Sequence, residues 1–256
     1  MERIHTVILA ARRIGASLLV LPAAALGGYV ADMRSASADG SPQGIAPDAP
    51  EFERIAAMVG DLVLCLGYTE LADGRGWNAA VCLTSDQVLG RYRQVHQPAA
   101  EAFVHGPGDR LAAFDTPIGR MGMLIDYDKT FPEAARTLAL DGARLVACLS
   151  AWPAGITKPG TRLPQDRQSR LFDVYDSARA AENQIVWVSA NQTGSAGGLR
   201  FLGQAKVVGP GGELLARTWA KAGLAVAEVD VETEVDQARL VLHHLQARRP
   251  DLYLEK

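Results

Sequence analysis

The sequence predicts an α/β fold in a single domain that spans residues 1–256. Segments with helical spacing alternate along the chain with short hydrophobic runs typical of buried strands. Hydrophobic residues make up 48% of the 256 residues and charged residues 21%, which suits one domain with a large buried core. The sequence contains no internal repeat and no low-complexity tract.

The first third of the chain predicts two helices and four strands. Ile4, Val7, Ile8 and Ala11 recur at helical spacing, and Gly15 is placed to end that helix. The second helix is expected over 50–59, and the strands over 18–21, 61–68, 78–83 and 88–92. Residues 31–50 are small, polar and proline-bearing, which predicts a surface loop between the first strand and the second helix.

The remainder predicts further strands with helices between them. A proline opens the helix expected at 132–140. The turn "GPGG" predicts a hairpin within 201–218. The other expected strands are 112–114, 121–125, 144–149, 185–190 and 223–231, and the other expected helices are 165–183 and 232–245.

Composition and charge favour a small-molecule partner. The net charge is −3 and the Lys and Arg residues are scattered, so we expect neither nucleic-acid binding nor a membrane surface. The longest apolar stretch, "GASLLVLPAAALGGYV", is shorter than the roughly 20 residues of a spanning helix and contains a proline. The amphipathic, charged start "MERIHTVILAARR" does not resemble a signal peptide, so we expect a cytoplasmic protein.

The cysteines and histidines give no sign of a metal site. Cys65, Cys82 and Cys148 are widely spaced and each lies in an apolar run, which predicts buried strand thiols and not a disulfide or a zinc site. The five histidines show no ligand spacing with cysteines or carboxylates. No metal and no cofactor are therefore expected.

A series of short motifs resembles the nitrilase superfamily of carbon-nitrogen hydrolases. In chain order they are "LVLPAAALGGY", "GRYRQVH", "EAFVHGPGD", "FDTPIGRMGMLIDYDKTFPEAARTLALDGARLVACLSAW", "RAAENQIVWVSANQTG" and "RRPDLY". The resemblance covers about residues 2–253 and implies a four-layer αββα sandwich and a homodimer. Members of that superfamily usually begin with a strand before the first helix. Here Met1 already lies at the start of the helix, so either the start is truncated or one strand is absent.

The resemblance also places the catalytic groups of that superfamily, and three of them are replaced. Aligned with its motifs, Ala23 stands in place of the general-base glutamate, Gln94 in place of the lysine and Asp126 in place of the cysteine nucleophile. A second glutamate is kept as Glu101. Because an aspartate is a weak nucleophile toward amides, thiol-type hydrolysis of amides and nitriles is expected to be lost. Cys148 is the one plausible substitute thiol, but its apolar flanks predict an inert group.

The resemblance puts Asp126 on a tight strand-to-helix turn, with Glu101 and Gln94 near it. Two carboxylates held close would share one proton, which suits general acid and base chemistry on a small molecule. Tyr127, Trp152 and Ala23 are expected to line the pocket. Alternatively, Asp126 satisfies the N-terminus of the following helix, in a non-catalytic protein kept for small-molecule binding or as a scaffold. The third possibility is a residual carbon-nitrogen hydrolase.

Overall fold

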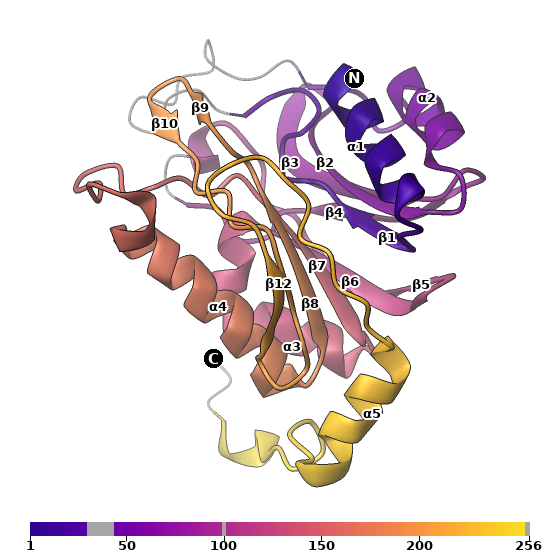
Figure 1. Ribbon diagram of the computed structural model, residues 1–256, viewed down its shortest axis with the longest axis vertical. Helices are drawn as coiled ribbons and strands as arrows, with labels where there is room; N and C mark the ends of the chain where they lie inside the picture. Colours follow the sequence, from indigo (N-terminus) through magenta and orange to yellow (C-terminus); the bar gives the residue numbers. More distant parts are fainter. Residues whose placement is uncertain (30–43, 99–100, 254–256) are drawn as a thin grey trace.

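Two β-sheets face each other in the middle of the molecule, and helices cover the outer face of each sheet (Figure 1). This computed structural model describes residues 1–29, 44–98 and 101–253. The first sheet has the order β1-β2-β3-β4, with β1 Leu18–Val20, β2 Val63–Ala72, β3 Arg75–Leu83 and β4 Val88–Arg93. The layers follow the αββα sandwich expected from the motifs.

The second sheet has the order β12-β11-β8-β7-β6-β5. Its strands are β5 Phe114–Thr116, β6 Gly119–Ile125, β7 Leu145–Ser150, β8 Val186–Asn191, β11 Lys206–Val208 and β12 Leu214–Arg217. Strands β6, β7 and β8 are parallel, whereas β5 and the β11–β12 hairpin are antiparallel to their neighbours. A separate two-stranded ribbon is formed by β9 Ser195–Ala196 and β10 Leu199–Arg200.

Helices α1 Glu2–Arg13 and α2 Pro50–Val59 lie on the first sheet, and α3 Pro132–Leu140 and α4 Arg167–Asn183 lie on the second (Figure 1). The remaining helix is α5 Val231–Val241. The short 3-10 turns are η2 Glu101–Phe103, η3 Asp126–Thr130, η4 Leu163–Gln165 and η5 Pro250–Leu252. No described helix is both long and apolar enough to cross a membrane.

Strand β2 shows how the layers are held together. Its side chains alternate between the two faces of the sheet, as strand geometry requires. Val63 and Cys65 pack between the two sheets, whereas Leu64 and Leu66 pack under α1 and α2. Gly67 lies where β2 meets the backbone after β1, because a Cβ atom there would be 2.4 Å from the Cα atom of Ala23. The first sheet is therefore buried on both faces.

Most of the predicted elements are present, and several have other bounds; for example, β3 begins at Arg75 and not at residue 78, and β5 is 114–116 and not 112–114. The predicted strand at 223–231 is wrong: in the described chain residues 223–230 pair with no strand, although Ala227 and Val229 still pack on the core. β2 extends to Ala72, beyond its expected end at residue 68, because it pairs with β3 as far as Ala72, opposite Arg75. The last helix ends at Val241 and not at residue 245. Most of the loop predicted at 31–50 lies outside the described residues.

Candidate functional site

Three parallel strands of the second sheet end at one edge, and Asp126 is the first residue after β6 at that edge. Its φ angle is +48°, in the left-handed region that Asp adopts more readily than most residues. This turn directs the carboxylate toward the neighbouring strand end, where Oδ2 accepts a hydrogen bond from the Ala151 backbone N–H at 3.0 Å. Carboxyl ends of parallel strands are common ligand-binding positions in α/β folds.

Asp126 does not cap the following helix, which was the structural alternative. Helix α3 begins at Pro132, and its N-cap Phe131 makes no side-chain cap in the described structure. A different carboxylate, Asp128, serves this turn by accepting hydrogen bonds from the Ile125 and His96 backbone N–H groups and from the Tyr92 hydroxyl. Asp128 thus accepts the hydrogen bonds that hold the backbone of this turn, and the Asp126 carboxylate is not needed for them.

Glu101 and Gln94 come from the first sheet and its connections, and each has a hydrogen-bond partner. Glu101 begins η2, and its Oε1 accepts a hydrogen bond from the Tyr29 hydroxyl. Gln94 follows β4, and its side-chain Oε1 accepts a hydrogen bond of 2.9 Å from Nδ2 of Asn78 in β3. The negative charge of Asp126 acts on both Glu101 and Tyr29, which places the two carboxyl groups in one electrostatic cluster.

Each of the three residues predicted to be catalytic has one buried polar atom without a hydrogen-bond partner in the described structure. These atoms are Asp126 Oδ1, Glu101 Oε2 and Gln94 Nε2. Unpaired buried polar atoms are rare in folded proteins because each costs about 1–3 kcal/mol. A set of two carboxyl oxygens and one amide N–H donor is therefore ready to pair with a ligand or with water.

Burial changes the protonation of both carboxyl groups. Burial raises the pKa of Asp126 to about 7, although the Ala151 N–H and the charge of Lys129 oppose this shift. The pKa of Glu101 is raised to about 8, first by burial and then by the charge of Asp126. Both carboxyl groups therefore hold a proton more strongly than in water, and an ionised Asp126 favours the protonated form of Glu101. One group can then accept a proton while the other donates one.

A buried chain of ion pairs begins at Lys129, in the turn that follows Asp126. Lys129 Nζ is 2.9 Å from Asp176 Oδ1, and Lys206 Nζ is 3.2 Å from Asp176 Oδ2. Both ammonium groups also approach the face of Phe172, and Trp187 Nε1 donates to Asp176 Oδ1. Because these lysines are already paired, neither one hydrogen-bonds to Asp126 in the described residues. The charge of Lys129 still favours the ionised form of Asp126.

The three expected lining residues lie in different surroundings. Tyr127 is 36% exposed and packs edge-on against Phe131. Trp152 is half-buried, and its ring packs near Phe172 while its Nε1 donates to Gln168. Ala23 is buried between the sheets, and its carbonyl accepts a hydrogen bond from Gln192. Their role against a ligand stays a prediction.

The cysteines are placed as the sequence predicts, in buried strands. Cys65, Cys82 and Cys148 are free thiols with no solvent exposure. Burial raises the pKa of the Cys148 thiol to about 12, and its Sγ lies 3.9 Å from Ser150 Oγ. A thiol that is both inaccessible and protonated is a poor nucleophile. No cluster of His, Cys, Asp and Glu side chains suited to a metal ion is found in the part of the chain described.

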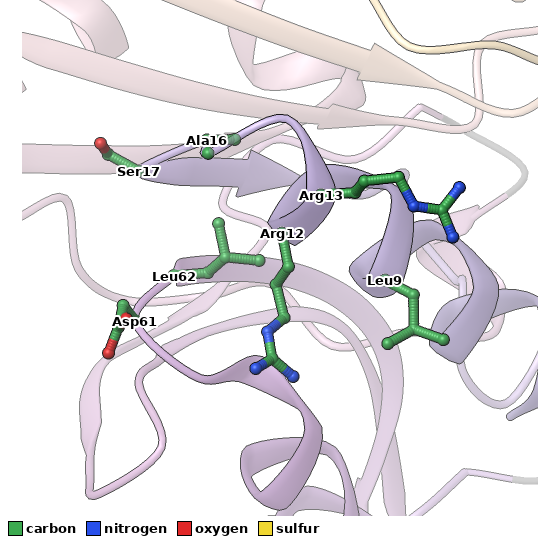
Figure 2. Close-up of a pocket in the computed structure, with 8 residues that line it drawn as sticks. Leu9, Arg12, Arg13, Ala16, Ser17, Asp61 and Leu62 are labelled. Atoms are coloured by element: carbon green, nitrogen blue, oxygen red, sulfur yellow. The ribbon is translucent and has the colours of Figure 1, made fainter.

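Two surface hollows are formed by other residues than these groups. Figure 2 shows one at the end of α1, where Arg12 reaches toward the turn after α2. It is lined by Leu9, Arg12, Arg13, Gly15, Ala16, Ser17, Asp61 and Leu62. A second hollow lies beside η2 and includes Glu70, Phe103 and His105. Neither is lined by Asp126, Glu101 or Gln94, and Asp126 itself is only 5% exposed.

Sequence reasoning missed three residues that complete the site. Tyr29 donates a hydrogen bond to Glu101, and Asn78 donates one to Gln94. The charge of Lys129 favours the ionised form of Asp126. From the sequence, Lys129 is expected to be exposed, because it lies next to acidic residues in a turn. Its burial depends on Asp176, 47 positions further along the chain. The sequence carried no signal for this burial, because α4 buries a largely polar face that contains Asp176, Arg179 and Asn183.

Comparison with known proteins identifies similar chains. A family model described as carbon-nitrogen hydrolase matches residues 1–239. The protein named "Hydrolase in pqqF 5'region" of Pseudomonas protegens is 30% identical over 259 aligned residues, which are 99% of this chain and 84% of that protein. A nitrilase of Pyrococcus abyssi is 30% identical over 228 residues, covering 86% of this chain and 79% of its own.

Solved structures agree with the fold. A carbon-nitrogen hydrolase from Helicobacter pylori superposes with a TM-score of 0.85 at 27% identity, covering 98% of this chain and 90% of that one. A mutant of the amidase from Nesterenkonia sp. AN1 in complex with butyramide superposes with a TM-score of 0.75 at 26% identity, covering 98% and 88%. The similarity thus extends over nearly the whole chain and not over one motif.

Proposed function

The chain belongs to the carbon-nitrogen hydrolase family, and from this premise we propose that it hydrolyses the C–N bond of a small carboxamide with Asp126 and Glu101 as an acid–base pair. The observation that carries the proposal is the set of unpaired buried atoms, two carboxyl oxygens beside one amide donor. A carboxamide offers one carbonyl acceptor and two N–H donors, which complement that set. Butyramide, bound by the related amidase, is a ligand of this class.

In the proposed reaction, water is the nucleophile and no covalent intermediate forms. The Asp126 carboxylate removes a proton from a water molecule, whose oxygen bonds to the amide carbon. Gln94 Nε2 donates a hydrogen bond to the carbonyl oxygen as negative charge develops there. Glu101 then protonates the nitrogen as the C–N bond breaks, which releases ammonia and a carboxylic acid, and the proton held by Asp126 returns to Glu101.

The two roles follow from the surroundings of each carboxyl group. The Ala151 N–H and the charge of Lys129 favour the ionised form of Asp126, which a general base needs. The charge of Asp126 favours the protonated form of Glu101, which a general acid needs. Cys148 takes no part because its thiol is buried and protonated. The activity proposed here therefore does not pass through a thioester. Because Asp126 is 5% exposed, ligand entry requires neighbouring groups to move.

The test is ammonia release from acetamide and butyramide by the purified protein at pH 7.5. Asp126→Asn and Glu101→Gln are each expected to lower the rate at least about 100-fold, the usual contribution of a positioned acid or base. Cys148→Ala is the matched control and is expected to leave the rate within about twofold. An unsubstituted protein that binds butyramide but releases no ammonia would favour a non-catalytic binding role. A rate that survives both carboxyl substitutions and is lost in Cys148→Ala would contradict the proposal.

A further inference from the structure

Two amide side chains in the first sheet and its connection contact each other at the base of the site. Asn78 lies in β3 and is buried, and its Nδ2 donates to Gln94 Oε1 at 2.9 Å. The backbones of the two residues are joined as well, since the Gln94 N–H donates to the Asn78 carbonyl at 2.9 Å. The position of Gln94 is therefore fixed by Asn78 through two contacts.

This pairing also decides which end of the Gln94 amide faces the carboxyl groups. An amide has an oxygen that accepts and a nitrogen that donates. Because Gln94 Oε1 is engaged by Asn78, Nε2 is the end that remains without a partner in the described structure. The Asn78 amide also stabilises the ionised form of Glu101, which favours the orientation with its nitrogen toward that carboxyl group.

We infer that Asn78 is a positioning residue that turns the Gln94 amide nitrogen toward the ligand and so makes the site selective for a neutral carboxamide group. This inference rests on the proposed function for the location of the site. Acetamide has a carbonyl oxygen that can accept from Gln94 Nε2. Acetamidinium has the same shape but only N–H donors, so Gln94 Nε2 would face another donor. The orientation of one amide thus contributes to acetamide binding and not to acetamidinium binding.

The experiment measures the binding of both probes by calorimetry to the unsubstituted protein, Asn78→Leu, Gln94→Leu and the double variant. Each single substitution is expected to weaken acetamide binding about 10-fold, the effect of one hydrogen bond. Acetamidinium binding should change less than about twofold, which also shows that the site is still folded. Because Asn78 acts through Gln94, the double variant should lose no more than Gln94→Leu alone. If Asn78→Leu does not fold, Asn78→Ala is read in the same way.

Three outcomes would overturn the inference. Losses that add in the double variant would mean that Asn78 acts independently of Gln94. Equal weakening of acetamide and acetamidinium in Asn78→Leu would mean a general structural role. Failure of acetamide to bind the unsubstituted protein would remove the proposed function together with this inference, whereas the first two results would leave the proposed function in place.

Discussion

The raised pKa of Asp126 makes a quantitative prediction about stability. Its pKa rises from 3.8 to about 7 in the folded protein because the carboxyl group is buried. One pKa unit corresponds to about 1.4 kcal/mol, so ionising Asp126 costs the folded state about 4 kcal/mol. A carboxyl group whose folded pKa is raised contributes stability that is fully present below its unfolded pKa. That stability is lost as the pH rises from about 4 through about 7.

The perturbation is Asp126→Asn, which has nearly the same shape and cannot ionise. The free energy of unfolding is measured by urea denaturation from pH 4 to pH 8, following tryptophan fluorescence. The difference between variant and unsubstituted protein is expected to shift by about 4 kcal/mol in favour of the variant over this range. Taking the difference removes groups common to both proteins. One of these groups is His105, because burial lowers its pKa to about 4.

Asp141→Asn is the matched control. The Ala113 N–H lowers the pKa of Asp141, so the stability that this carboxylate contributes is lost only below about pH 4, and the difference for Asp141→Asn should stay nearly constant from pH 4 to pH 8. A difference for Asp126→Asn that stays constant within about 1 kcal/mol from pH 4 to pH 8 would contradict the raised pKa, because the carboxyl group would then ionise in the fold as easily as in water.

Two further substitutions and one labelling experiment test other parts of the structure. Lys129→Met leaves Asp176 without its closest cation and is expected to lower the free energy of unfolding by about 3–5 kcal/mol. The double variant Lys129→Met with Asp176→Leu should recover much of this loss, as measured by urea unfolding. Equal losses in the single and the double variant would argue against the pairing. Gly67→Ala places a Cβ atom 2.4 Å from Ala23 Cα and should cost about 3 kcal/mol, while Gly198→Ala, with open space around it, should leave the melting temperature nearly unchanged. Cys148 should resist iodoacetamide in the native protein and react in urea, as seen by mass spectrometry; rapid native labelling would contradict its burial.

Local signals in the sequence were sufficient for many elements of the fold. Helix α3 begins at Pro132 as expected, because proline is compatible with a first helical turn. β6 and β7 were predictable as apolar runs because they are buried on both faces. The segment 223–230 was not, because its alternation reports side-chain burial but cannot show whether a neighbouring strand is present to bond with it.

Contacts between the sheets could not be predicted in the same way. Motif order placed Asp126, Glu101 and Gln94 at one site, and the structure gives each of them an unpaired buried atom. The sequence held no comparable signal for Tyr29 or Asn78, which bond to Glu101 and Gln94 from distant parts of the chain. The length of β2 was also underestimated, because it pairs with β3 as far as Ala72, opposite Arg75.

The most direct test of the carboxyl pair is a ¹³C NMR titration of the Asp126 and Glu101 side chains. Two coupled titrations near pH 7 and pH 8 are expected, because burial raises both pKa values and the charge of Asp126 raises that of Glu101 further. In Asp126→Asn, the pKa of Glu101 should fall, since the charge that raises it is gone. If both carboxyl groups titrate near pH 4 and neither responds to substitution of the other, they do not share a proton, and the proposed acid–base mechanism is wrong.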